Sequence, residues 1–309
     1  MDISRFVHTF GTYLKGRYGE RVHKLSLAGD FTCPNRDGTL GKGGCTFCNV
    51  RSFGRDAQEL SISEQIGREK LKTDRAGRYL AYFQAYTSTY AEVETLKALY
   101  EEAIGQADIV GLCVGTRPDC VPDAALDLLA GYQSRGFEVW LELGLQSAQD
   151  ATLGRINRGH GFNAYRDAVG RARARNLNIC THLIVGLPGE TRTELFDTQN
   201  RVLELGVQGL KLHPLMIVRG SRMAAQYQRG EVAPMTLEAY ADVAAELIRH
   251  TPPEVVFHRV SATAQAPTLI APEWCAPRWA AMQAIADRLN ASGPQGSALG
   301  RPWSPLRQP

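Results

Sequence analysis

The sequence predicts an α/β fold in which about six parallel strands, with helices packed outside them, form a partial or complete β/α barrel. Short apolar runs alternate with segments of helical periodicity from about residue 22 onward. Parallel strands joined by helices require right-handed crossovers, which place the helices on the outside of the sheet. The loop after the first run is rich in cysteine and lacks the glycine turn of a doubly wound nucleotide-binding sheet, the competing architecture. In either architecture the chemistry belongs at the carboxyl ends of the strands.

Seven apolar runs are the candidate strands. They cover residues 22–28, 79–86, 108–115, 137–146, 177–186, 209–218 and 254–260. Between the second and third runs, apolar side chains recur with the spacing of one helix face, at Leu96, Leu99, Tyr100, Ala103 and Ile104. Further helices are expected over residues 57–74, 122–134, 162–175, 190–205, 236–250 and 274–290.

Composition excludes two broad classes of protein. Of the 309 residues, 44% are hydrophobic and 22% are charged, which is typical of a globular protein and excludes a disordered chain. No apolar stretch approaches the roughly 20 residues that span a bilayer, so no membrane partner is expected. Asp2 and Arg5 interrupt the first apolar run, so we expect no signal or transit peptide and a cytoplasmic location.

Three of the seven cysteines lie in one glycine-rich loop after the first candidate strand. They are Cys33, Cys45 and Cys48, with eleven residues between the first two and two between the last two. Three thiolates can hold three irons of a 4Fe–4S cluster and leave the fourth iron open. A structural zinc ion needs a fourth ligand, for which a remote His23 is one candidate, and buried thiols in a turn are a third interpretation. The other four cysteines are dispersed, so only one cluster is expected.

With these residues the chain resembles the radical S-adenosylmethionine (SAM) superfamily, specifically the small branch related to the Elongator catalytic subunit. The eleven-residue gap is wider than the usual three, but it resembles the form used in this branch. Further segments are similar to family motifs in the same order along the chain. They are residues 115–119, 142–147, 155–160, 182–190 and 211–220. The resemblance covers about residues 22–220. It implies a partial or complete β/α barrel of the radical SAM type, which is related in architecture to the TIM barrel.

The resemblance divides the chain into four parts. We expect an N-terminal extension over residues 1–21, a radical SAM core over residues 22–220, and a C-terminal helical and strand extension over residues 221–291. The segment 292–309 is rich in Gly and Pro and is expected to be a disordered tail.

The resemblance also implies the cofactors and the residues that contact them. Cys33, Cys45 and Cys48 would hold the 4Fe–4S cluster. The other implied SAM contacts are Phe47 near the adenine, Gln146 and Arg158 at the amino acid end, Gln84 and Glu142 as acceptors for charged groups, and His182. Gln84 departs from the acidic segment usual at that strand, and His182 between apolar neighbours is also typical of a core position.

The implied function is a radical SAM enzyme that cleaves SAM reductively to a 5'-deoxyadenosyl radical. The Elongator resemblance implies tRNA as the substrate, at the side chain of the wobble uridine, and an electron donor such as flavodoxin or ferredoxin. Residues 1–55 carry nine basic and four acidic side chains, a charge excess compatible with phosphate contacts, and Arg17, Arg21 and Lys24 form the surface expected to bind tRNA. No catalytic residue is assigned.

Two alternative functions stay open at this point. One is radical SAM chemistry on a small molecule such as a porphyrin precursor, suggested by the spacing of Gln146 and Arg158. The other is a zinc-containing nucleic-acid-binding module in which the three cysteines are structural.

Overall fold

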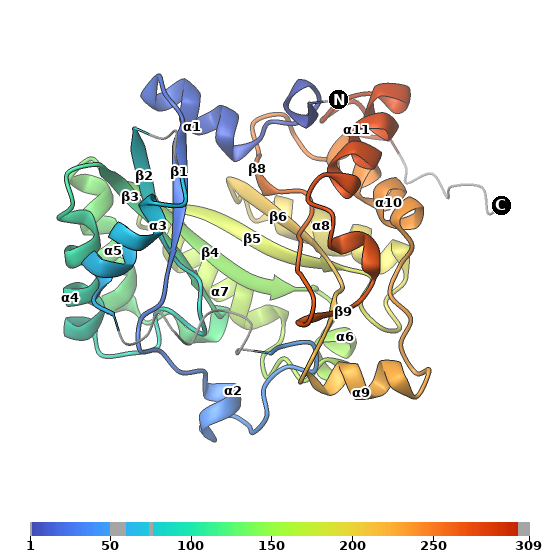
Figure 1. Cartoon of the computed structure of the whole chain (residues 1–309), viewed down its shortest axis with the longest axis horizontal. Helices are drawn as coiled ribbons and strands as arrows, with labels where there is room; N and C mark the ends of the chain where they lie inside the picture. The colour runs from blue at the N-terminus through green and yellow to red at the C-terminus, as the bar shows by residue number, and fades with distance from the viewer. Residues whose placement is uncertain (1, 50–59, 74–76, 302–309) are drawn as a thin grey trace.

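Seven parallel strands form one curved sheet in the computed structural model, which describes residues 2–49, 60–73 and 77–301. The strands are β1 (Val22–Leu27), β2 (Arg78–Phe83), β3 (Ile109–Thr116), β4 (Glu138–Gln146), β5 (Asn178–Val185), β6 (Gly209–Pro214) and β8 (Val256–Arg259). Their order in the sheet is the order of the chain, and β1 and β8 are the two edges (Figure 1). The predicted α/β barrel is therefore confirmed as a partial one, with seven strands and not about six.

Helices cover the outer, convex face of the sheet, as the crossover argument predicts (Figure 1). The helices that connect successive strands are α3 (Ile62–Lys70), α4 (Val93–Ile104), α5 (Asp123–Ser134), α7 (Phe162–Arg173), α8 (Arg192–Glu204) and α10 (Leu237–Arg249). Helix α11 (Ala280–Ser292) packs against α10. Among the described residues, no helix combines the length and the apolar character needed to cross a bilayer.

Side-chain alternation along the strands separates an outer core from the interior of the half-barrel. In β4, Leu141 and Leu143 are fully buried in the main core, which includes side chains of the outer helices. The residues that alternate with these two leucines face the interior. Trp140 belongs to a separate interior cluster, and the carboxylate of Glu142 contacts side chains of other strands. The apolar outer face thus holds the fold together while the inner face is free to carry polar groups.

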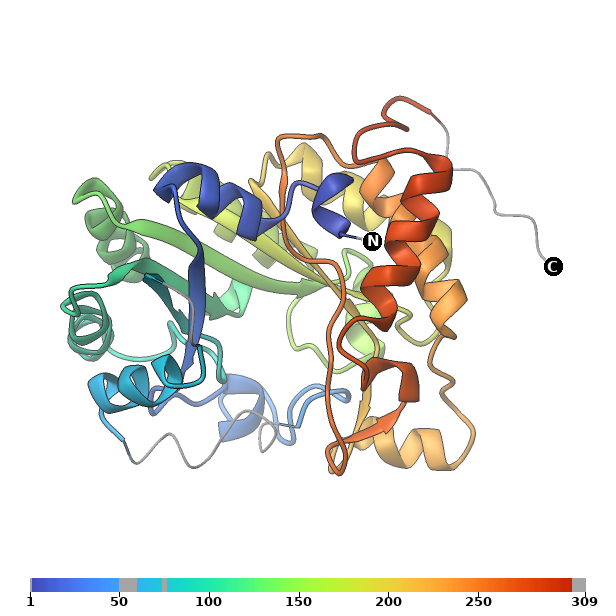
Figure 2. The same ribbon diagram turned by 45° about the horizontal axis from the view of Figure 1, so that its top comes forward.

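An N-terminal helix that the sequence analysis did not predict, α1 (Phe10–Tyr18), closes the interior at the amino ends of the strands (Figure 2). The Thr9 side chain caps its first turn by accepting from the amide of Thr12, at 3.2 Å. Phe10 and Leu14 pack with Trp140 inside the half-barrel. The chain therefore leaves the interior open only toward the carboxyl ends of the strands.

Short elements gather at those carboxyl ends. They are α2 (Pro34–Asp37), α6 (Asp150–Arg155), α9 (Arg222–Gln228) and the antiparallel pair of β7 (Ile217–Val218) and β9 (Leu269–Ala271). Within residues 2–49, 60–73 and 77–301, 3₁₀ turns lie at Ile3–Arg5, Pro118–Cys120 and Glu273–Cys275. Figure 1 shows α2 and α9 at the end of the molecule opposite α1.

Two helices have other bounds in the structure than the sequence predicts. The helix expected over residues 274–290 begins only at Ala280, after Pro277, whose missing amide hydrogen disfavours a helix interior. The helix expected over 57–74 is α3, and residues 57–59 and 74 lie outside the described residues.

Part of the expected tail has a defined place. The Gln295 side chain accepts from the amide of His8 at 2.8 Å and donates to the carbonyl oxygens of Pro252 and Val255 at 2.7 and 2.8 Å. These bonds connect this part of the chain to the N-terminal segment and to the loop before β8. Residues 302–309 lie outside the described residues.

Candidate active site

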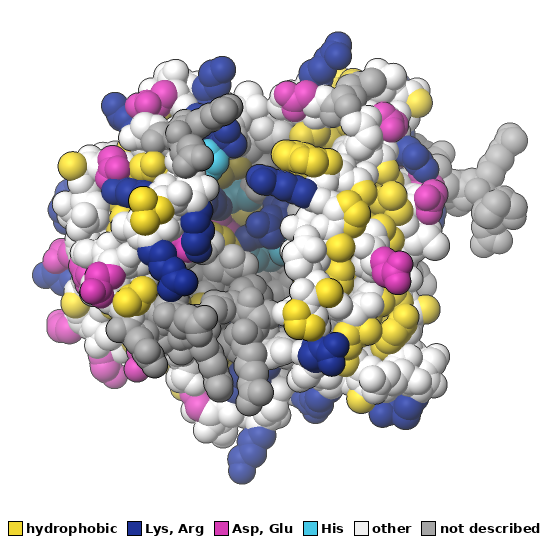
Figure 3. Space-filling view, viewed as in Figure 1, with side chains coloured by type: hydrophobic (Ala, Val, Ile, Leu, Met, Phe, Trp, Pro, Cys, Tyr) yellow, Lys and Arg dark blue, Asp and Glu magenta, His cyan; other side chains and the backbone are white. Residues whose placement is uncertain are grey.

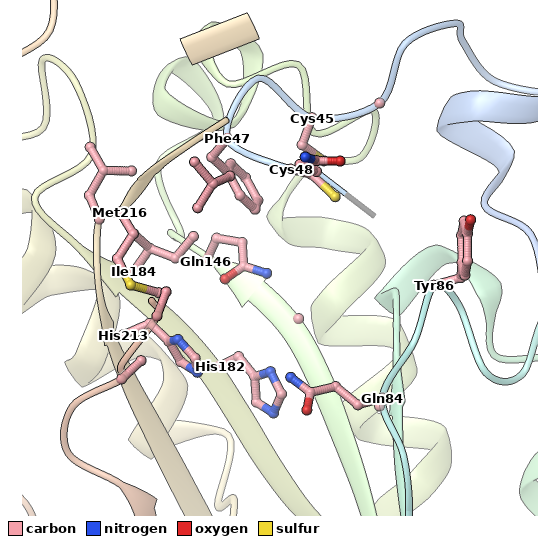
Figure 4. Close-up of a pocket in the computed structure, with 18 of the residues that line it drawn as sticks. Cys45, Phe47, Cys48, Gln84, Tyr86, Gln146, His182, Ile184, His213 and Met216 are labelled. Atoms are coloured by element: carbon pink, nitrogen blue, oxygen red, sulfur yellow. The ribbon is translucent and has the colours of Figure 1, made fainter. Parts of the chain in front are cut away.

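The three clustered cysteines line one cavity of about 450 Å³ at the carboxyl ends of the strands. Cys33 precedes α2, and Gly38 ends that short helix with a φ of +101°, a left-handed conformation that favours glycine. Gly44, with a φ of +76°, brings the chain back before Cys45; a Cβ atom there would lie 2.7 Å from Nε of Arg36. The glycines therefore fold the loop so that Cys33, Cys45 and Cys48 face the same space (Figure 4).

Neighbouring segments hold the cysteine loop in place through its backbone. The amide of Thr46 donates to the carbonyl oxygen of Ile156 at 2.9 Å, and Asn157 Nδ2 donates to that of Gly44 at 2.9 Å. From the other side, the amide of Met223 donates to the carbonyl oxygen of Thr46 at 2.8 Å. The loop is thus clamped between the end of α6 and the start of α9.

Cys45 receives two buried hydrogen-bond donors. Asn35 Nδ2 lies 3.7 Å from its Sγ atom and Arg158 Nη1 lies 3.5 Å from it. The Cys45 sulfur therefore lies among polar groups at the cavity and not in an apolar core.

The position of His23 bears on the zinc alternative that the sequence left open. A structural zinc ion needs four protein ligands. His23 is the second residue of β1, at the end of the strand away from the cysteine loop, so it does not supply a fourth ligand beside the three cysteines.

The other walls of the cavity come from the ends of β2 to β6. Figure 4 shows Gln84, Gln146, His182 and His213 around the hollow, with Phe47 beside Cys45 and Cys48. Gln146 has a φ of +79°, an unusual conformation for a residue with a side chain, which is found where function constrains the backbone. The structure therefore brings together Phe47, Gln84, Gln146, Arg158 and His182, as expected, and their contacts with a cofactor stay a prediction.

Two buried arginines lie on the cysteine side of the cavity. Arg117 binds Asp119 with two parallel hydrogen bonds of 2.9 and 2.7 Å, and Arg158 Nη2 donates to the carbonyl oxygen of Gly144. Arg117 Nη1 and Arg158 Nε are buried without a hydrogen-bond partner among the described residues. The two guanidinium groups add positive charge to the cysteine side of the cavity. Arg117 was not assigned a role from sequence, although it lies in the family-like segment 115–119.

Glu142 lies beneath the cavity. Its side chain is fully buried and is not among the lining residues. Its two oxygens bind four side chains of other strands. These are Lys24, Lys211 at 3.1 Å, His182 at 2.7 Å and His258 at 3.1 Å. Glu142 and these four residues form a charged layer beneath the cavity, and the contact of Glu142 with SAM stays a prediction.

Burial and charge set the protonation states in this layer. Burial alone would raise the pKa of Glu142, but Lys211 and Lys24, with hydrogen bonds from the two histidines, hold it well below its usual value. Burial, reinforced by the nearby lysines, lowers the pKa of His182 to about 4 and that of His258 to about 3. Both histidines are therefore neutral near pH 7, and the layer carries two lysines against one carboxylate.

His213, Met216 and Arg259 also line the cavity and were not predicted as site residues. His213 had a usable signal, because it lies two positions after Lys211 in β6 and alternation places both on the inner face. Arg259 ends a strand of four residues, for which the sequence offers no comparable motif.

Two family models match most of the chain. The model of the radical SAM superfamily matches residues 36–202, and that of the radical SAM C-terminal domain matches residues 207–291. Protein YhcC of Escherichia coli K12 is 58% identical over 306 residues, which cover 99% of each chain.

The chain is also similar to a more distant relative and to a solved structure. The tRNA uridine(34) acetyltransferase of Dehalococcoides mccartyi is 28% identical over 232 residues, which cover 69% of this chain and 49% of that protein. The solved structure of the archaeal Methanocaldococcus infernus Elp3 has a TM-score of 0.64 at 18% identity and covers 87% of this chain and 63% of that chain. The second likeness shows a shared fold.

Replacing Glu142 with glutamine should destabilise the protein by about 3–5 kcal/mol, because two buried lysines would lose their counter-charge. Urea unfolding at pH 7 measures the effect. Glu204→Gln on the exposed end of α8 is the matched control and should change the free energy of unfolding by less than about 0.5 kcal/mol. Equal stability of the two variants would show that the layer does not depend on the carboxylate.

Stability should fall as the pH drops from about 6.5 toward about 4. The unfolded chain binds protons on histidines in this window, whereas burial keeps the same histidines neutral in the folded state. Four histidines contribute, with folded pKa values of about 3 for His160, about 4 for His182, about 3 for His258 and well below the usual value for His213. Glu190, whose pKa burial raises to about 7, acts in the opposite direction as a single group.

Urea unfolding at intervals from pH 8 to pH 5 tests the sign of this dependence. A free energy of unfolding that stays level or rises as the pH falls through 6 would contradict it. The His182→Gln variant should show a shallower slope than the unmodified protein.

Proposed function

The chain belongs to the radical SAM superfamily, in a branch related to the Elongator catalytic subunit, and we propose that its substrate is tRNA, at the side chain of the wobble uridine. It is a radical SAM enzyme, and the enzymes of this superfamily use a 4Fe–4S cluster and SAM. The nonenzymatic zinc module is therefore not retained. The substrate is the part that goes beyond family membership.

The residues of the cavity fit both cofactors. Cys33, Cys45 and Cys48 would hold the cluster through three of its irons, which leaves one iron for the amino acid end of SAM. Arg117 and Arg158, with their unpartnered buried nitrogens, would offset the negative charge of the cluster and its thiolates. When both cofactors are bound, they supply reductive cleavage of SAM and a carbon radical that abstracts hydrogen from the substrate.

This chain's own residues would bind and orient SAM. Gln84 and Gln146 present amide groups at neighbouring strand ends, and Arg158 adds a cation that suits a carboxylate. A Cβ atom at Gly144 would lie 3.0 Å from both Arg158 Nη2 and Gln146 Nε2, so glycine leaves these two groups room to meet one ligand. The buried walls formed by Ile184 and Leu215 exclude water from the same space.

The tRNA proposal is supported chiefly by the relative from Dehalococcoides mccartyi, whose name states that it acts on uridine 34 of tRNA. The chain spans only about half of that protein, so its complete reaction is not carried over. The proposal then needs a basic surface near the mouth of the cavity.

Two of the three basic residues expected to bind tRNA, Arg17 and Lys24, lie away from the mouth of the cavity, and the role of that surface stays a prediction. Lys24 lies inside the half-barrel and binds Glu142, and Arg17 binds Glu138 at 2.7 Å. Both lie toward the amino ends of the strands, whereas the cavity opens at their carboxyl ends.

A different set of basic side chains borders the cavity. Lys42 is exposed on the cysteine loop, and Arg222 Nη2 donates to the carbonyl oxygen of Gly44 at 2.7 Å. The carbonyl oxygen of Arg219 accepts from Asn49, which lines the cavity. These three residues, Lys42, Arg219 and Arg222, form the basic rim, which could contact phosphates while a base enters the cavity.

The Cys45→Ala variant should lose the cluster and form no 5'-deoxyadenosine from SAM and dithionite. Anaerobic reconstitution of the unmodified protein should give about four irons per chain. Cys275→Ala is the matched control, because Cys275 is buried in a 3₁₀ turn outside the cavity. Full iron content and SAM cleavage in Cys45→Ala would remove this cysteine from the cluster ligands.

The unmodified holoenzyme should convert a wobble-uridine nucleoside in tRNA isolated from cells that lack the enzyme, as detected by mass spectrometry of digested tRNA. Lys42→Glu should weaken tRNA binding in a filter assay and lower the salt dependence by about one phosphate contact. Arg166→Glu, on the exposed outer side of α7, is the control with the same charge change. No changed nucleoside and equal binding by both variants would exclude tRNA as the substrate at this rim.

A further inference from the structure

One cation that lines the cavity, Arg259, is not among the residues proposed to hold the cluster or SAM. Arg259 ends β8 and pairs in register with Lys211 of β6, at the edge of the sheet opposite β1 and the cysteine loop. Arg259 is exposed to solvent and its side chain lines the cavity, and among the described residues it has no ion pair or hydrogen bond. Figure 3 shows that Lys, Arg and His side chains gather in the hollow between the two halves of the molecule.

The groups around Arg259 leave its charge uncompensated. The acidic side chain that faces this interior layer is Glu142, and its oxygens are already bound by Lys24, Lys211 and two histidines. Three cations, Lys24, Lys211 and Arg259, therefore stand against one carboxylate.

The neighbouring groups respond to this excess of positive charge. Burial, with added repulsion from Arg259 and Lys211, holds the pKa of His213 well below its usual value. Burial also lowers the pKa of Lys211 to about 8, and Arg259 and Lys24 oppose its charge while Glu142 favours it. Burial is the larger cause of both shifts, and repulsion from Arg259 adds to each, as expected for a cation that lies near both groups. A positive potential in a concave site attracts anions.

The loop that follows β8 adds neutral donors to the same cavity. Thr263 and Thr268 line it, and their hydroxyl groups can donate to an anion. Ile184, Met216 and Val218 form an apolar wall of the same cavity. A cation, a few hydroxyl groups and an apolar wall are the usual components of a site that orients a small polar group.

We propose that Arg259 anchors an anion-binding subsite on the β8 side of the cavity, which holds a carboxylate or phosphate group of the substrate. The inference rests on the proposed function only for the molecule that carries this group. The subsite places the anion across the cavity from the cysteine loop, so the part of the substrate that reacts lies between them. Neutral substrates of the same shape bind less tightly, because they leave Arg259 without a partner.

Small anions test the subsite without RNA and without turnover. Sodium acetate, sodium phosphate and neutral acetamide are titrated by calorimetry into the anaerobic holoenzyme with SAM bound, in a buffer of low chloride content. Acetate or phosphate should bind to one saturable site, and acetamide should not. The anion that binds more tightly identifies the group as a carboxylate or a phosphate.

Arg259→Gln should weaken the binding of the preferred anion by about tenfold or more, and Arg259→Lys should restore part of it. Arg166→Gln, the control with the same loss of charge on the outer side of α7, should bind as the unmodified protein does. Iron content and the midpoint of thermal unfolding show whether each variant is folded and loaded.

Several results would overturn the proposal. They are the absence of saturable anion binding by the unmodified holoenzyme, equal binding by folded Arg259→Gln, an equal loss in Arg166→Gln, or binding of acetamide as tight as that of acetate. Because no RNA is present, failure of tRNA as a substrate would leave a positive anion result standing. Conversely, modified tRNA together with unchanged anion binding in Arg259→Gln would refute the subsite alone.

Discussion

The buried carboxylate of Glu142 is the interaction on which the interior of the half-barrel depends. The side chains that bind it come from β1, β5, β6 and β8, so one residue of β4 connects strands from both edges of the sheet. A closed barrel joins its edges with backbone hydrogen bonds, and among the described residues β1 and β8 do not pair. Here Lys24 of β1 lies 3.1 Å from His258 of β8, and both bind Glu142. Side chains thus do part of what a closing ladder would do.

Helix α1 packs against this layer from the amino ends of the strands. Phe10 stacks on the ring of His258 with centroids 3.9 Å apart, and Nζ of Lys24 lies 4.5 Å from the centroid of Phe10. The apolar end of the interior therefore meets the charged layer directly. Because burying charges is costly, each must find its partners, and only one register of the strands provides them. We therefore expect that loss of the Glu142 carboxylate destabilises the folded state.

Much of the fold follows from local sequence patterns, and much of the site does not. The seven apolar runs became the seven strands, because alternating burial and helical stripes are local properties. The cysteine loop was recognisable because its three thiols lie within 16 residues of sequence. By contrast, Lys24 and Glu142 are 118 positions apart, so nothing near Glu142 indicates that its oxygens are occupied. The contacts of this carboxylate with side chains of distant strands could therefore not be predicted from its motif.

Arginine side chains lie on both sides of the cavity. On the cysteine side, Arg117 and Arg158 hold buried nitrogens without partners; on the other side, Arg259 stands without a counter-ion among the described residues. Donors and cations in such positions repel one another when nothing lies between them. Anionic groups are therefore the occupants that these positions favour. Glu142 balances only one of the two lysines that bind it, so the layer beneath the cavity adds to the positive potential that such a ligand meets.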